Sequence, residues 1–265
     1  MRERGGIGHL RRHRNNFNMR NVFLGTSGLV LPVPNKSFYP AAFKEKSRLT
    51  YYSFLFNTIE INSSFYKLPR KSTIANWAGS VPDNFAFTFK LWKEITHRPA
   101  LEFDPGNIGQ FMEAISAAGT KKGCLLVQFP GKIGIDDYNQ IEKILYFINE
   151  SDSTKEWKVH VELRNTSLYV SEIYELLEEY NAGMVIHDIA KSTAPLEAFE
   201  GESVYLRFHG PEPGYRGSYS EKFLQNYARL IRDWHREGKP VYGYFNNTLG
   251  AALDNLTTLK QLISI

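Results

Sequence analysis

Charged side chains recur where short β-like segments of this chain end, and their types suit proton transfer. The candidates for catalysis are Glu60, Glu162, Asp188 and His209. Carboxyl and imidazole groups act as general acids or bases when their surroundings adjust the pKa. Imidazole is the group among them whose ordinary pKa lies near neutrality. We therefore interpret this set as acid–base machinery.

Cations and hydrogen-bonding side chains at the same ends could hold an anion. Arg164 and Arg207 can each donate paired hydrogen bonds to an oxyanion, and Lys90 adds a point charge. The further candidates for substrate binding are Asn62, Tyr66, His97, Gln128, Tyr215, Asn246 and Asn247. A glycine-rich segment, 210–217, follows the seventh β-like segment, where α/β barrels often bind phosphate. We expect a small phosphorylated or carboxylated substrate.

Carboxylates and imidazoles could instead bind a divalent metal. The candidate ligands are Glu60, Glu162, Asp188, His160, His187 and His209. No two of them stand at a recognised ligand spacing, and a lone strand histidine is more often a hydrogen-bonded core group. We expect no cofactor and no metal site, and keep a divalent metal as an alternative.

The elements that must position these residues alternate regularly. The β-rich segments are 22–26, 57–62, 85–90, 125–129, 159–164, 184–188, 204–209 and 241–246. Helical periodicity covers 47–56, 72–79, 108–118, 138–149, 167–180, 221–236 and 250–262, with a short sixth helix expected at 194–200. Such alternation implies a parallel sheet, and eight repeats favour closure into a barrel. The predicted fold class is α/β, a single (β/α)8 TIM-type barrel over residues 21–265.

Alternation within the strands predicts which side chains face the lumen. Val159 and Val161 oppose His160 and Glu162 along one segment, because side chains two apart share a face. If the apolar face packs on outer helices, the polar face lines the barrel and its last residues meet at the mouth, where barrel enzymes keep their active sites. An antiparallel sheet with one wet face gives the same alternation, but the intervening helices argue against it. A purely structural ion-pair network is the alternative to a binding site.

The net charge of +4 is unevenly distributed. Residues 1–20 contain six arginines and one glutamate, a charge of +5, so the other 245 residues sum to −1. We expect residues 1–20 to be a disordered basic tail, or Met19 to be the true initiator. Nucleic acid is therefore not the expected partner. No apolar segment could span a membrane or serve as a signal-peptide core, so we expect a cytoplasmic location and no membrane partner.

Several motifs resemble one family in order, from about Asn21 to the end of the chain. They are Gly25-Thr26-Ser27-Gly28, Phe38-Tyr39-Pro40, the run 56–66, Lys90 with Ile95-Thr96-His97, Leu126-Val127-Gln128-Phe129-Pro130, Glu162-Leu163-Arg164, Arg207-Phe208-His209-Gly210 and Tyr244-Phe245-Asn246-Asn247. These are similar to the YecE-like family, domain of unknown function seventy-two. The resemblance implies an α/β barrel and supplies no activity.

One departure from that family lies in the first loop. Family members usually follow Gly-Thr-Ser-Gly with tryptophan, tyrosine and a second tryptophan, whereas this chain has Leu29, Leu31 and Pro34. A substrate that stacks on this loop is therefore not expected. From the residues we predict an enzyme, a hydrolase or an isomerase or lyase, that acts at the mouth. A non-catalytic binding protein for an anionic metabolite and a nucleic-acid-processing barrel are the alternatives.

Overall fold

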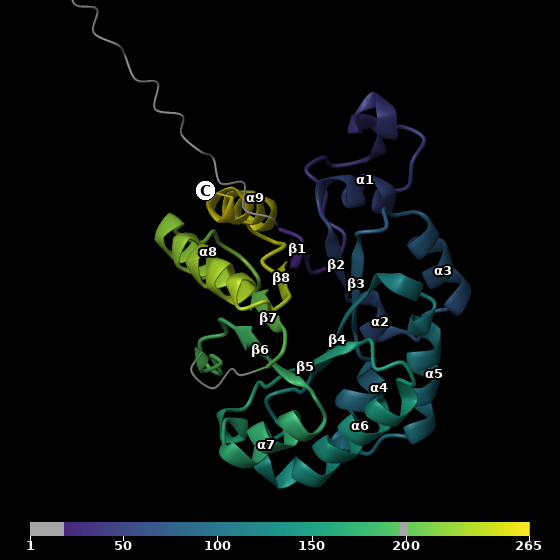
Figure 1. Ribbon diagram of the computed structural model, residues 1–265, viewed down its shortest axis with the longest axis vertical. Helices are drawn as coiled ribbons and strands as arrows, with labels where there is room; N and C mark the ends of the chain where they lie inside the picture. The colour runs from purple at the N-terminus through teal and green to yellow at the C-terminus, as the bar shows by residue number, and fades with distance from the viewer. Residues whose placement is uncertain (1–18, 197–200, 265) are drawn as a thin grey trace, which may run out of the picture.

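Eight parallel strands form the centre of the computed structural model, which describes residues 19–196 and 201–264 (Figure 1). The strands are β1 (Val22–Thr26), β2 (Thr58–Ile61), β3 (Ala86–Lys90), β4 (Lys122–Gln128), β5 (Lys158–Glu162), β6 (Gly183–His187), β7 (Val204–Phe208) and β8 (Val241–Phe245). Hydrogen-bonded neighbours run in the order β1-β8-β7-β6-β5-β4-β3-β2. The predicted α/β barrel is confirmed.

The seam between β1 and β2 is closed mainly by a side chain. The amide of Asn57 donates to the carbonyl oxygen of Val22 at 2.8 Å and accepts from the Leu24 N–H at 3.1 Å. Near the mouth the Gly28 N–H donates to the carbonyl oxygen of Glu60 at 2.8 Å. These bonds satisfy backbone groups that a continuous ladder would otherwise pair, so the ring nearly closes.

Helices surround the strands on the outside of the ring (Figure 1). They are α1 (Arg48–Leu55), α2 (Ser63–Tyr66), α3 (Lys71–Gly79), α4 (Lys93–Thr96), α5 (Pro105–Ser116), α6 (Tyr138–Ser151), α7 (Ser171–Glu179), α8 (Glu221–Arg236) and α9 (Ala252–Ile263). Short 3-10 turns occupy Lys36–Phe38, Ala41–Phe43, Pro99–Leu101, Gly119–Lys121, Ile135–Asp137 and Thr166–Leu168. Helix α8 shows why these sequences form helices. Ser220 accepts from the Phe223 N–H as an N-cap, and Leu224, Ala228 and Ile231 recur on one buried face.

The strands divide the interior into two layers, as the alternation predicts. Outward residues such as Phe87, Val161 and Leu206 belong to the large apolar core between strands and helices. Inward residues such as Leu126 and Tyr205 form a separate cluster inside the ring. The polar side chains of the same inward face therefore sit in the lumen toward its carboxyl end.

Some expectations fail or lie outside the described residues. Of the sixth helix expected at 194–200, Ala194 and Pro195 are not helical and residues 197–200 are not described. Residues 1–18 of the expected tail are also outside the described residues, whereas Met19 packs against the apolar core. Among the helices that are described, none is both long and apolar enough to cross a membrane.

Candidate active site at the carboxyl ends of the strands

A buried arginine joins two carboxylates at the centre of the mouth. Arg207 on β7 donates to Glu60 on β2 through Nε at 3.0 Å and Nη2 at 2.8 Å, and its Nη1 donates to Glu162 on β5 at 2.8 Å. The Arg207 side chain is 3% exposed and both carboxylates are fully buried. Tyr205 adds a hydrogen bond to Glu60 at 2.5 Å. This centre uses Arg207 for internal pairing and leaves it little capacity for a ligand.

The same pairing sets the ionisation of the two glutamates. Burial alone would raise the pKa of Glu60, but the charge and hydrogen bonds of Arg207 outweigh it and hold the pKa below its ordinary value. For Glu162 burial is again opposed, by Arg207 and then Arg164, and the pKa falls well below the ordinary value. Both groups are therefore ionised at neutral pH and are poor proton donors.

Arg164 is the more accessible arginine. Its Nε donates to Glu162, its Nη2 donates to Nε2 of His209 at 3.2 Å, and its side chain is 20% exposed. Its remaining terminal nitrogen, Nη1, donates to none of the described residues. A guanidinium with an unused donor and access to solvent can bind an oxyanion.

The hydrogen bonds of His209 assign its protonation. Its Nε2 accepts from Arg164 and Arg207, both at 3.2 Å, so this nitrogen carries no proton and the ring is neutral with its proton on Nδ1. Burial lowers the pKa of His209, and the nearby arginines lower it further against the opposing effect of Asp188 and Glu162. Nε2 thus becomes available as a base when Arg164 turns to a ligand and Arg207 keeps only its contacts to the carboxylates.

Asp188 contacts both the backbone and the ring of His209. Its Oδ1 accepts from the His209 backbone N–H at 2.7 Å and lies 3.5 Å from Nδ1, a distance that orients the ring without a full hydrogen bond. Tyr219 donates to its other oxygen. Asp188 directly follows β6, and Met184 and Ile186 lie four and two residues before it on the outward face of that strand. Asp188 shares this face and therefore reaches His209 from outside the lumen face.

Lys90 ends β3 in a different environment from the arginines. Its Nζ donates to Oε1 of Gln128 at 2.8 Å and lies 4.1 Å from the centroid of the Phe65 ring. His97 packs edge-on against the same ring at 4.8 Å, and its Nδ1 is 2.8 Å from the hydroxyl of Thr96. Burial lowers the pKa of His97 to about 4, helped by Lys90 and the other cations nearby. The histidine that shares the Phe65 ring with Lys90 is therefore neutral.

The other predicted substrate residues are spread around this centre. Tyr66 and Tyr215 are 69% and 43% exposed, and the Tyr215 ring centroid lies 6.0 Å from that of His209. Asn247 is fully buried, and its Nδ2 donates to the carbonyl oxygen of Gly217 and the amide oxygen of Asn255. The backbone of Asn246 donates to the Phe208 carbonyl at 2.7 Å. Tyr215 can contact a ligand, whereas Asn247 holds the loop that follows β7.

Several buried polar atoms after the strands have no hydrogen-bond partner among the described residues. They are Ser27 Oγ after β1, Asn62 Oδ1 after β2, Trp92 Nε1 after β3, His209 Nδ1 after β7 and Asn247 Oδ1 after β8. Unsatisfied buried groups are costly and uncommon, and their gathering at one end of the barrel fits a surface that binds a polar ligand. Ser27, Trp92 and Tyr205 were not predicted as site residues.

His160 and His187 behave as core groups. Nε2 of His160 lies 3.1 Å from the carbonyl oxygen of Ser203, and burial lowers the pKa of His160 to about 4. Nε2 of His187 lies 2.9 Å from the Leu163 carbonyl. Within residues 19–196 and 201–264 no three His, Cys, Asp or Glu side chains come together as a metal site requires.

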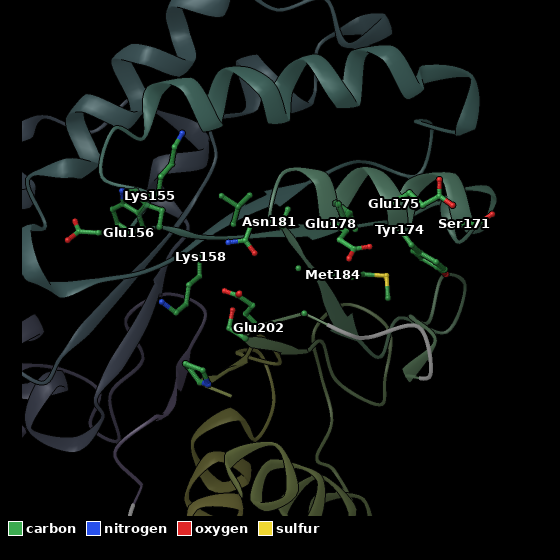
Figure 2. A pocket seen from close by; sticks show the side chains of 18 residues that line it. Lys155, Glu156, Lys158, Ser171, Tyr174, Glu175, Glu178, Asn181, Met184 and Glu202 are labelled. Atoms are coloured by element: carbon green, nitrogen blue, oxygen red, sulfur yellow. The ribbon is translucent and has the colours of Figure 1, made fainter. Parts of the chain in front are cut away.

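A cavity of about 710 Å³ lies elsewhere on the barrel. Figure 2 shows side chains that line it. Lys158 and Gly183, the first residues of β5 and β6, line it together with Glu175 and Glu178 of α7. It therefore opens at the amino-terminal ends of the strands, away from Glu162. We take the mouth as the candidate site, because the polar groups converge there and barrel enzymes act at that end.

Fold and site together define a TIM-type α/β barrel with an ion-paired centre at the carboxyl ends of its strands. The chain belongs to the family described as protein of unknown function DUF72, which matches residues 23–265. It is 24% identical to UPF0759 protein YunF of Bacillus subtilis, over 92% of this chain and 95% of that protein. It is 29% identical to UPF0759 protein YecE of Escherichia coli K12, over 30% of this chain and 29% of that one.

Solved structures agree on the fold. A DUF72 family protein of Enterococcus faecalis superposes with a TM-score of 0.73 at 21% identity, covering 92% of this chain and 96% of that one. A DUF72 family protein of Thermotoga maritima superposes with a TM-score of 0.69 at 22% identity, covering 92% of this chain and 99% of that one. The family assignment that the motifs imply is confirmed. At these sequence identities the likeness to the solved structures shows the fold alone.

Proposed function

We propose that this protein is an enzyme that binds a small carboxylated or phosphorylated substrate at the mouth of the barrel and moves a proton on it. The observation that supports this most is Arg164, a partly exposed arginine with an unused donor beside a neutral histidine. Arg207 and its two paired carboxylates form a rigid support beneath Arg164 and the histidine. Lys90 adds positive charge from the far side of Gln128.

The roles follow from which groups are already paired. Arg164 binds the anionic end of the substrate in place of its contact to His209, which leaves Arg207 Nη1 as the other donor to Nε2 at 3.2 Å. That Nη1 also donates to Glu162 at the shorter distance of 2.8 Å, so the Nε2 lone pair becomes available when Arg207 keeps its contact to Glu162 alone. His209 then accepts a proton, and Asp188 orients its ring and stabilises the imidazolium. The two glutamates are held as ions by Arg207, so the geometry favours His209 over them for proton transfer. This arrangement suits an isomerase or lyase that removes a proton next to a carbonyl group.

Titration calorimetry tests the anion site. Phosphate, or a small carboxylate such as pyruvate, should bind the wild-type protein saturably, because Arg164 offers charge-assisted hydrogen bonds. Arg164→Met should weaken that binding by about 1.5–3 kcal/mol, or roughly 10- to 150-fold. Arg229→Met removes an exposed arginine from α8 and should leave the affinity unchanged.

Saturable binding is the decisive readout, because phosphate also stabilises proteins generally by exclusion from their surface. Equal affinity in the wild type and in Arg164→Met would exclude Arg164 as the anion contact. A protein that binds the anion but never turns over any substrate would instead be a sensor of that metabolite.

A further inference from the structure

We propose that Lys90 is a nucleophile that forms an imine with the carbonyl group of the substrate, so that the substrate class is a small aldehyde or ketone carrying a carboxylate or phosphate. The inference rests on the proposed function, since Arg164 would bind the anionic end while Lys90 attacks the carbonyl carbon.

The first observation in support concerns which cationic side chains around the mouth are paired with carboxylates. Both arginines there are paired with buried carboxylates, Arg207 with Glu60 and Glu162, and Arg164 with Glu162. Lys90 forms no ion pair with the described residues, and its one hydrogen bond goes to the neutral amide of Gln128. A lysine kept for its charge would be expected to pair with a carboxylate. The geometry thus leaves this amine unpaired while fixing its position.

The second support is the shielding of the amine. The ring of Phe65 covers one side of Nζ at 4.1 Å, and His97 packs against that ring. Gln128, which is 7% exposed, lies on another side. One N–H is therefore held by an amide oxygen, and no further hydrogen bond to the described residues occupies the nitrogen. A lysine that is desolvated and close to other cations is a recurrent form of activated amine.

The electrostatic surroundings point the same way. The pKa of Lys90 is lowered to about 8, mainly because the amine is buried; Arg207 and Arg164 also lower it, and Glu162 and Glu60 oppose the shift. His97 is neutral at pH 8 and adds no competing charge. At neutral pH such an amine is roughly 300-fold more often unprotonated than a lysine with the ordinary pKa of about 10.5.

The covalent step balances without any further reactant. The neutral amine of Lys90 attacks the carbonyl carbon, an Nζ–C bond forms, and the oxygen becomes the hydroxyl of a carbinolamine. That hydroxyl then leaves as water, which takes both hydrogens that the amine originally carried, and a C=N bond remains. Protonation of this imine makes the neighbouring C–H acidic, which gives the proton that His209 removes.

Reductive trapping tests the inference on the full chain. The protein is incubated at pH 8 with pyruvate, with dihydroxyacetone phosphate or with acetone, and sodium borohydride is added to reduce any imine to a stable amine. We expect intact-mass spectrometry to show one adduct with pyruvate or with dihydroxyacetone phosphate and little with acetone, which has no anionic group. Peptide mapping should place the adduct on Lys90.

Two variants make the result specific. Lys90→Arg keeps the positive charge but cannot form an imine, so the adduct should disappear while calorimetric binding of phosphate persists. Lys132→Arg removes an exposed lysine near the mouth and should leave the adduct unchanged. The trapping rate should rise with pH and level off above pH 8, whereas surface lysines continue to gain reactivity to about pH 10.

The failures of the two proposals are distinguishable. Saturable phosphate binding without any adduct from the three probes would overturn the role of Lys90 and leave the anion site standing. Adducts spread evenly over surface lysines, or retained in Lys90→Arg, would overturn it as well. Absence of both phosphate binding and adduct would overturn the proposed function together with this inference.

Discussion

Arg207→Met is expected to lower the free energy of unfolding by about 3–5 kcal/mol at pH 7.5, the range found when one partner of a buried ion pair is removed. The variant leaves the buried charge of Glu60 without an ion pair and that of Glu162 with Arg164 as its remaining arginine partner. Urea denaturation followed by circular dichroism measures the change. Arg229→Met, which removes an exposed arginine, should stay within about 0.5 kcal/mol of the wild type.

The difference in the free energy of unfolding between the wild type and Arg207→Met should depend on pH, and its direction can be worked out. In the wild type the pKa values of Glu60 and Glu162 are lowered on folding, so their contribution is present above the unfolded pKa of about 4.3 and is lost as the pH falls through the folded values. Without Arg207, burial raises the folded pKa of Glu60, whereas Arg164 still opposes the effect of burial on Glu162. The penalty is therefore greatest at neutral pH and fades as Glu60 takes up a proton. The two stability curves should therefore converge between pH 7 and pH 4.

A compensating variant separates charge from packing. Glu60→Gln and Glu162→Gln combined with Arg207→Met should recover most of the loss, because the fully buried charges are then removed and Arg164, which loses its partner Glu162, is 20% exposed. A loss below about 1 kcal/mol in Arg207→Met alone would mean that Arg164 or Lys90 can replace Arg207. The ion-paired centre would then be adaptable and could not serve as a rigid support for the site.

The parts of the site that lie in strands could be predicted from local alternation. Glu162 on β5 and Arg207 on β7 face the lumen because side chains two apart share a face, a rule that needs no knowledge of the fold. Tyr205 shares the parity of Arg207 on β7, so the same rule places it on the lumen face, but it does not predict the hydrogen bond of Tyr205 to Glu60. What no local pattern encodes is the pairing of Arg207 with two carboxylates, which depends on the relative heights of β2, β5 and β7.

The parts that lie beyond the strands were harder to predict. Asp188 was expected to point inward, but Met184 and Ile186 share its parity and pack outward, so it reaches His209 from behind. The four-residue helices α2 and α4 are too short to show periodicity, yet Phe65 of α2 and His97 at the end of α4 frame Lys90. The difference between Arg164 and Arg207 as ligands for an anion likewise depends on exposure, which the sequence does not contain.

His209→Gln is expected to slow proton transfer by about 10²- to 10⁴-fold, the usual contribution of a general base. The reaction to follow is exchange of the pyruvate methyl protons with deuterium in heavy water, which an imine at Lys90 makes possible and proton NMR detects. The geometry assigns this role to Nε2 of His209, which holds no proton and accepts from Arg164 and Arg207, both at 3.2 Å. The carboxylate of the substrate replaces His209 as the acceptor of the Arg164 hydrogen bond. Glutamine preserves a polar side chain but supplies no basic nitrogen.

Comparison with other variants distinguishes catalysis from folding. In His209→Gln the adduct trapped at Lys90 should persist, because the amine and Arg164 are untouched, while exchange is lost. Asp188→Asn should slow exchange less and shift its pH profile to lower pH, because Asp188 raises the pKa of His209. Normal exchange in His209→Gln together with its loss in His97→Gln would move the base to the neutral histidine beside Lys90. Loss of both adduct and exchange in His209→Gln would show instead that this histidine holds the mouth together and is not the proton acceptor.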